Sequence, residues 1–185
     1  MGSETALESK NHARLVFTVQ TAKSSAGAAK KSWSLPEGGW EPLLRISACE
    51  ILEFMLGVHV DDLPDSAPKV LADMTAMIGL AGELSGVVTI RCPAAAAATL
   101  ASKMLGTEVS PTDADTRDAL GEIANVIAGT LKAKVPGLDD ACLLSTPTIV
   151  IGLDYKLFSI SNSTTIGVAL QFEGQPLWIT LDLHR

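Results

Sequence analysis

The chain has 185 residues, of which 47% are hydrophobic, and it carries a formal net charge of −7. This length and hydrophobicity suffice for one sizeable domain with a core of its own, and they exclude a largely disordered chain. Residues 1–40 hold five Lys and Arg against three Asp and Glu, whereas residues 41–185 hold nine against eighteen. An acidic body of this kind argues against nucleic acid or an anionic membrane as a partner.

Cysteine usage and the first residues of the chain predict a cytoplasmic protein. Cys49, Cys92 and Cys142 are far apart and odd in number, which favours neither a metal site nor a disulfide framework. No apolar run reaches the roughly 18 residues that a spanning helix needs. The N-terminus also lacks the positive start and the apolar stretch of a signal peptide. We therefore expect a soluble protein in a reducing cytoplasm, without a metal site of its own.

Residues 1–38 are predominantly small, basic and glycine-bearing, and we interpret them as a flexible N-terminal extension. The remaining residues, 39–185, form the predicted domain. Its first element is a helix, because Pro42 suits a first helical turn and apolar residues then recur at helical spacing. Gly57 is expected to close this helix as a C-cap.

A β-hairpin and a second helix follow in the predicted order. The strand-like runs at 70–80 and 84–92 are joined by a short, glycine-bearing connection, which predicts an antiparallel pair. Pro93 opens an alanine-rich helix that is expected to run as far as Gly106.

The third helix has the clearest start and end signals, and the rest of the chain is strand-like. Thr112 or Asp113 is expected to cap the helix, and lysines in its last turn precede the pair Pro136–Gly137. Beyond it, strand-like runs occupy residues 141–152, 155–160, 164–172 and 176–183. This order predicts an α+β domain with a mostly antiparallel sheet of about six strands and three main helices packed on it.

The third helix carries Glu122 and Asn125 on a face turned away from the core. At about 100° per residue, the predicted core stripe consists of Leu120, Ile123, Ala124, Ile127 and Leu131. On the side of Glu122 away from this stripe, Asp118, Asn125, Gly129 and Lys132 lie within about 80° of it. Gly121 and Gly129 each cost the helix about 1 kcal/mol relative to alanine, which asks for a packing or a functional reason.

The chemistry available to Glu122 and Asn125 is limited and therefore informative. A carboxamide is a poor base, but it can hold a water molecule by accepting and donating hydrogen bonds, and a carboxylate can clamp a cation. Such a pair suits positioning, with the strong electrostatics supplied by a partner. By itself, however, this spacing on an amphipathic helix is far more often a solvated surface than a site.

The stretch DALGEIANVIAGTLKAKV at 118–135, followed by LSTPTIVIG at 144–152, resembles a known family. It is similar to the Asp/Ser-x-x-x-Glu-x-x-Asn helix and the later Pro of the CheC/CheX/FliY chemotaxis phosphatases, and most of all to the CheX-like type. The positions of this motif are occupied by Asp118, Glu122, Asn125 and Pro147. Residues 41–57 and 82–106 resemble the family's first helix and the strand and helix before the motif.

The resemblance implies a phosphatase that acts on the aspartyl phosphate of a CheY-type response regulator. Asn125 would orient the attacking water, and Glu122 would pair with the regulator's lysine. The regulator would supply Mg²⁺ and the phosphoryl group, so no cofactor of the chain's own is expected. The first helix has Glu50 and Glu53 but no asparagine three residues after Glu50, which predicts one site per chain.

The remaining predictions concern partners. Asp118, Gly121, Gly129 and Lys132 are expected to form the partner-binding surface around the pair, and the family implies a homodimer formed through the sheets. Two alternatives stay open. The chain could be a non-catalytic docking module for a receiver domain or another signalling protein, which could lose Asn125 and keep its affinity. It could also be a structural dimerisation domain without a regulator partner.

Overall fold

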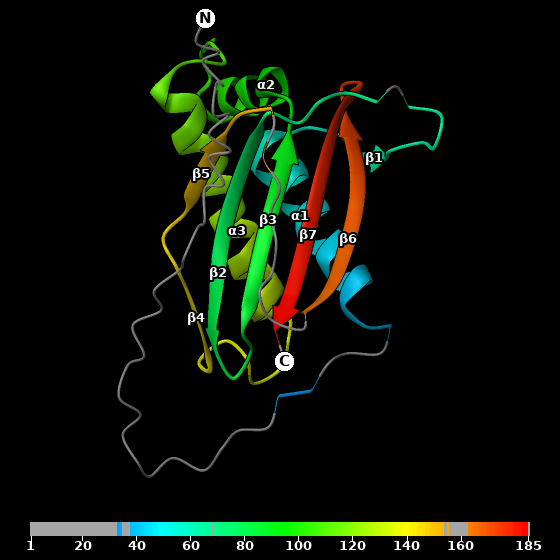
Figure 1. Cartoon of the computed structure of the whole chain (residues 1–185), viewed down its shortest axis with the longest axis vertical. Helices are drawn as coiled ribbons and strands as arrows, with labels where there is room; N and C mark the ends of the chain where they lie inside the picture. Colours follow the sequence, from blue (N-terminus) through cyan, green and yellow to red (C-terminus); the bar gives the residue numbers. More distant parts are fainter. Residues whose placement is uncertain (1–32, 35–37, 68, 154, 156–162, 185) are drawn as a thin grey trace, which may run out of the picture.

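The computed structural model describes residues 33–34, 38–67, 69–153, 155 and 163–184 (Figure 1). The extension predicted at residues 1–38 thus lies almost wholly outside the described residues, as does most of the strand predicted at 155–160. Trp33 is described, and its ring packs against Trp40 at the edge of the core, with ring centroids 5.9 Å apart. The boundary between extension and domain stays a prediction.

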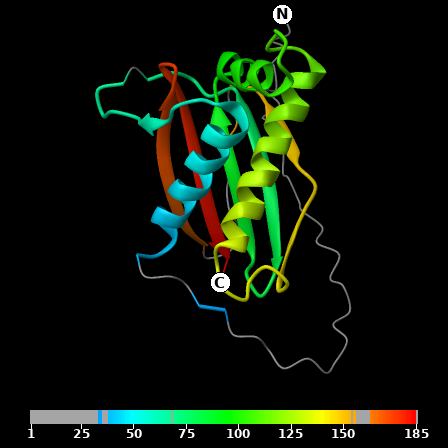
Figure 2. The same ribbon diagram turned by 180° about the vertical axis from the view of Figure 1, so that it is seen from behind.

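Helices cover one face of a seven-stranded, antiparallel sheet, as Figures 1 and 2 show from opposite sides. The helices are α1 (Trp40–Leu56), α2 (Ala94–Leu105) and α3 (Ala114–Ala133). The strands are β1 (Asp61–Asp62), β2 (Met74–Gly82), β3 (Gly86–Cys92), β4 (Cys142–Leu144), β5 (Thr148–Ile151), β6 (Ser163–Phe172) and β7 (Gln175–His184). They lie in the order β1-β6-β7-β3-β2, and β4 and β5 both pair with the outer edge of β2. The predicted α+β class is therefore confirmed.

The helix ends follow the chemistry of their glycines. Gly57 and Gly106 take the left-handed conformation after α1 and α2, with φ of 62° and 68°, which a residue without a Cβ adopts at little cost. The predicted closures of these helices are confirmed. The start of α2 is stabilised by Asp73, whose carboxylate accepts a hydrogen bond of 2.6 Å from the backbone N–H of Ala94. That cap comes from a residue 21 positions earlier, so the sequence pattern of the helix did not reveal it.

The run predicted at 141–152 is two strands rather than one, because residues 145–147 leave the sheet between them. Ser145 holds the break in place. Its N–H donates to the carbonyl of Gly79 at 2.9 Å, and its hydroxyl accepts from the N–H of Gly79 at 2.8 Å. Pro147 has no N–H to donate to a strand partner, which suits it to the break. The interruption is what carries Pro147 to the surface of α3.

The core lies between the helices and the inner face of the sheet. Alternate residues of β2, β3 and β7 point into it, among them Ile78, Ile90 and Ile179, which are fully buried. The two-residue strand β1 pairs with β6 at the edge of the sheet. Among the described residues, no helix is both long and apolar enough to cross a membrane.

Candidate functional site

The turn before α3 is tied to the first turn of the helix by side chains. The N–H of Ser110 donates to the carboxylate of Asp113 at 2.8 Å, and the hydroxyl of Thr116 donates to the carbonyl of Ser110 at 2.7 Å. Asp113, one of the two residues predicted as the cap, occupies the N-cap position. Its side chain binds the preceding turn rather than the helix N–H groups. These contacts fix where α3 begins, and hence which of its residues face outward.

The predicted faces of α3 are confirmed by burial. All five side chains of the expected core stripe are fully or almost fully buried: Leu120, Ile123, Ala124, Ile127 and Leu131. Asp118 and Glu122 are exposed and Asn125 is half-buried. Asp118, Glu122 and Asn125 therefore project from one outward strip of α3. Glu122 and Asn125 are one turn apart on it, and the amide of Asn125 is less exposed than the carboxylate of Glu122.

Two neighbours bound this strip. Taking Glu122 as zero, Lys134 lies at about +120° around α3 and Gly121 at about −100°. Lys134 forms an ion pair of 2.8 Å with Glu50, so the first of these sides faces α1. Gly121 is buried beneath Pro147, and a Cβ on Gly121 would lie only 3.1 Å from the Cβ of Pro147. The strip with Glu122 therefore opens to solvent between α1 on one side and the β4–β5 connection on the other.

Packing within the chain explains one of the two glycines of α3. A Cβ on Gly121 would press on Pro147, whereas a Cβ on Gly129 would meet Leu144 of β4 at an ordinary 3.9 Å. Only Gly121 therefore requires the absence of a side chain. Since Gly121 is buried by the chain itself, its contact with a partner stays a prediction, as does that of the half-buried Gly129.

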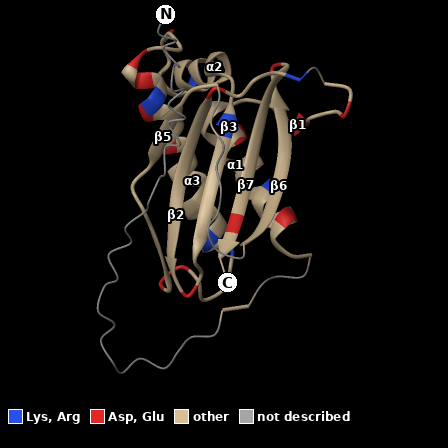
Figure 3. Cartoon of the chain, in the orientation of Figure 1, with Lys and Arg blue, Asp and Glu red and all other residues tan. Residues whose placement is uncertain are grey.

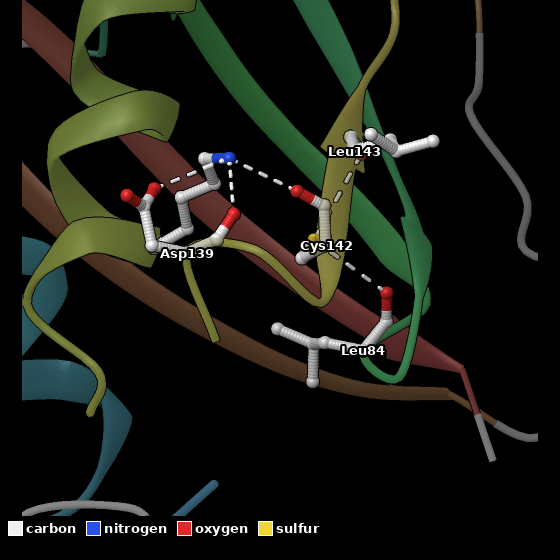
Figure 4. Close-up of polar contacts among 5 residues, drawn as sticks. Leu84, Asp139, Cys142 and Leu143 are labelled. Carbon is white, nitrogen blue, oxygen red and sulfur yellow. Dashed lines mark hydrogen bonds and ion pairs between the residues drawn. The ribbon is translucent and has the colours of Figure 1, made fainter. Parts of the chain in front are cut away.

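Lys132, the cation predicted to border the partner, binds within its own chain to Asp139 and Cys142, which Figure 4 labels. Its ammonium donates to the carbonyls of Asp139 and Cys142 at 2.8 and 3.0 Å, and it lies 3.3 Å from the carboxylate of Asp139. The side chain is only 20% exposed. Lys132 thus ties the end of α3 to the start of β4, a role that the sequence did not show because both carbonyls lie beyond the helix. Its part in partner binding stays a prediction.

The thiols of the chain are poorly suited to nucleophilic chemistry. Burial raises the pKa of Cys92 to about 12, and the charge of Asp73 adds to this effect. Burial is also the largest cause of the raised pKa values of Cys49 and Cys142, although Lys132 acts in the opposite direction on Cys142. A thiol with a raised pKa offers little thiolate at neutral pH.

The described residues also contain no group of three or more His, Cys, Asp or Glu side chains placed to hold a metal ion. What the site offers is an exposed carboxylate beside a half-buried amide, on a helix backed by the core. Such groups can orient a water molecule and hold a cation.

Comparison with known proteins places this geometry in a family. The family model described as "Chemotaxis phosphatase CheX" matches residues 74–171, a range that contains Glu122, Asn125 and Pro147. No protein of curated function matches the sequence significantly.

Solved structures share the fold at low sequence identity. The chemotaxis protein CheX from Desulfovibrio desulfuricans is 20% identical, with a TM-score of 0.64, over 77% of this chain and 97% of that one. CheX from Vibrio vulnificus is 18% identical, with a TM-score of 0.68, over 82% and 100%. CheX in a complex with CheY, BeF₃ and Mg²⁺ from Borrelia burgdorferi is 20% identical, with a TM-score of 0.59, over 79% and 98%. Since the family model covers more than half of the sequence, the chain belongs to the family of the chemotaxis phosphatase CheX.

Proposed function

We propose that this chain is a phosphatase that hydrolyses the aspartyl phosphate of a CheY-type response regulator. The observation that carries the proposal is the placement of Glu122 and Asn125 on one open strip of α3, in a chain of the CheX family. Pro147, the motif residue that lies outside α3, packs against Gly121, next to Glu122 in the helix. The alternative without catalysis, a docking module, uses the same strip.

In the proposed reaction, water attacks the phosphorus atom of the receiver's phosphoaspartate and the aspartate carboxylate leaves. The products are the free aspartate and inorganic phosphate, and the proton of the water passes to phosphate or solvent. The amide of Asn125 accepts one hydrogen bond from the water and donates another, which holds the oxygen in line with the bond that breaks. Positioning a nucleophile in this way can contribute up to roughly 7 to 11 kcal/mol.

Glu122 has a different task, which its exposure suits. Its carboxylate is free to reach a cation on the docked protein, and we assign it the receiver's phosphate-contacting lysine. With Glu122 bound to that lysine, the Mg²⁺ held by the receiver would balance the charge of the phosphoryl group. Asn125 would then position the attacking water. Asp118, exposed one turn earlier on the strip, is assigned a supporting contact with the partner.

A CheY-type partner is supported by the structural neighbour from Borrelia burgdorferi, which is a complex of CheX with CheY, BeF₃ and Mg²⁺. We further infer a homodimer and a cytoplasmic location. The homodimer is supported by the outer edge of β6. Along that edge, β1 pairs only with Gln171 and Leu170 of β6. In the described part of the chain, the rest of that strand's outer edge has no strand partner. The location is supported by the free thiols of the described cysteines.

The test is the decay of a phosphorylated CheY-type receiver with Mg²⁺, in the presence of the wild type or of Asn125→Ala. We expect the wild type to accelerate the decay and the variant to lose at least roughly 10²-fold, the scale seen when one transition-state-positioning group is removed. Glu108→Gln, an exposed change between α2 and α3, is the matched control and should retain the rate. Binding without acceleration would favour the docking module, and full activity of Asn125→Ala would contradict the role of that residue.

A further inference from the structure

Among the large hydrophobic side chains in the described part of the chain, that of Phe54 on α1 is the most exposed. It is 91% exposed, compared with 70% for Leu71 and 62% for Leu143. Isolated apolar residues on a surface are common, but an aromatic ring presented almost completely to water from a regular helix contributes nothing to the core. The question is which surface of the molecule this ring belongs to.

Two neighbours on α1 show that Phe54 lies on the side of α1 that faces α3. Glu50 and Ser47 are four and seven residues earlier, at about −40° and +20° from Phe54 around the helix. The carboxylate of Glu50 pairs with Lys134 of α3 at 2.8 Å, and Ser47 is fully buried. Phe54 therefore projects outward from the shoulder of α1 nearest to α3.

Along the axis of α3, Phe54 lies roughly 7 Å from the level of Asn125. The two helices pack against each other and run in opposite directions, α1 upward and α3 downward in Figure 2. From Glu50 to Phe54, α1 advances about 6 Å, while Lys134 and Asn125 are about 13 Å apart along α3. With helix axes 8 to 10 Å apart, the Cα of Phe54 lies within roughly 15 Å of that of Asn125.

A second exposed apolar side chain, Ile151, lies on the opposite flank of the strip. Ile149 of β5 approaches α3, with its Cδ1 atom 3.6 Å from where a Cβ of Gly121 would be. Ile151 is two residues further along the strand and so points to the same face of the sheet. It is 55% exposed. The strip with Glu122 thus runs between two exposed apolar side chains that come from different elements.

We propose that Phe54 is the apolar anchor by which this chain holds the receiver domain, with Ile151 as a second contact across the strip. The inference rests on the proposed function and adds the source of its affinity. A receiver whose phosphoaspartate reaches Asn125 must cover this strip. A standard interface of about 800 Å² per partner corresponds to a disc of roughly 16 Å radius, which extends to Phe54.

Charge makes such an anchor necessary. Figure 3 shows acidic residues on helices, strands and connecting loops alike. With a formal net charge of −7, the chain offers no long-range attraction to a phosphorylated, acidic site. Affinity must then come from local contacts, and buried aromatic side chains dominate the binding energy of interfaces of this size. On the side of α1 that faces α3, Phe54 is the aromatic residue whose side chain is exposed.

The experiment compares Phe54→Ser with Leu143→Ser in two assays. Leu143 is also exposed, at 62%, but it pairs with Ala81 on the sheet face opposite to the helices, as the inward-facing pair Leu144 and Leu80 shows. The first assay measures the affinity for a Mg²⁺-loaded CheY-type receiver treated with beryllofluoride, which stands in for the phosphoryl group. The second measures receiver dephosphorylation as a function of phosphatase concentration.

We expect Phe54→Ser to raise the Kd at least roughly tenfold, with a maximal rate at saturation within about twofold of the wild type. Phe54→Leu should recover part of the affinity, and Leu143→Ser should match the wild type. Because Phe54 is exposed, the circular dichroism of each variant should be unchanged, which excludes a loss of fold as the cause.

An unchanged Kd in Phe54→Ser would overturn the inference while leaving the phosphatase intact. A change of Phe54→Ser from dimer to monomer, with an unchanged Kd, would overturn it equally and assign the ring to contact between copies. If the wild type binds the receiver without catalysis, the phosphatase proposal fails, and a Phe54-dependent Kd still supports the anchor. If the wild type binds no CheY-type receiver, both proposals are wrong.

Discussion

Alanine substitutions at the two glycines of α3 should have different effects on stability. In a helix interior, alanine is favoured over glycine by about 1 kcal/mol. At Gly129 the new methyl group would lie 3.9 Å from Leu144, an ordinary contact, so Gly129→Ala should raise the free energy of unfolding by about 0.5 to 1 kcal/mol. At Gly121 it would lie 3.1 Å from the Cβ of Pro147, inside the 3.5 to 4.0 Å that carbon atoms prefer.

Overpacking of this kind typically costs 1 to 3 kcal/mol, which cancels or exceeds the gain in helix propensity. We therefore expect Gly121→Ala to be less stable than Gly129→Ala by at least about 1 kcal/mol. Urea denaturation followed by circular dichroism measures this difference directly, provided that the m-values agree. Equal stabilisation by the two substitutions would refute the reasoning, because it would mean that Pro147 is not held against α3.

Lys132→Met should lower the free energy of unfolding by about 1 to 3 kcal/mol in the same assay, because two backbone carbonyls lose a charged donor. Lys134→Met, which removes only a partly exposed ion pair, should cost less than about 1 kcal/mol, and a larger loss at Lys134 than at Lys132 would contradict this assignment. For Cys92, burial raises the pKa in the folded state from 9.0 to about 12. The unfolded chain therefore loses this proton first, so the stability is complete below pH 9 and falls as the pH rises toward 12. Between pH 7 and pH 10, the wild type should lose about 1 kcal/mol more than Cys92→Ala does, and parallel pH profiles would show that the thiol titrates normally.

Local sequence chemistry predicted the elements that depend on neighbouring residues. Helix α3 is an example, because its apolar period, its acidic first turn and its basic last turn all lie within one stretch of chain. The same period placed Glu122 and Asn125 on the outward face, which depends only on the geometry of a helix. The glycines that close α1 and α2 are equally local signals.

Contacts between distant segments were decided only by the tertiary structure. The division of the run at 141–152 into β4 and β5 depends on hydrogen bonds between Ser145 and Gly79, which are 66 residues apart. The cap of α2 by Asp73 and the binding of Lys132 to carbonyls beyond its helix have the same character. A sequence period carries no information about such partners, since they are set by the pairing of strands and the packing of helices on them.

The site combines both kinds of information. The sequence by itself determined that an acid and an amide share one face of a helix, because 3.6 residues per turn fixes their directions. Only the tertiary structure decided what surrounds them: Pro147 fills the space left by the missing side chain of Gly121, and Phe54 stands exposed on the neighbouring helix. The physical reason is that the direction of a side chain on a helix is a local property, whereas the surface into which it projects is built by segments that meet only when the chain folds.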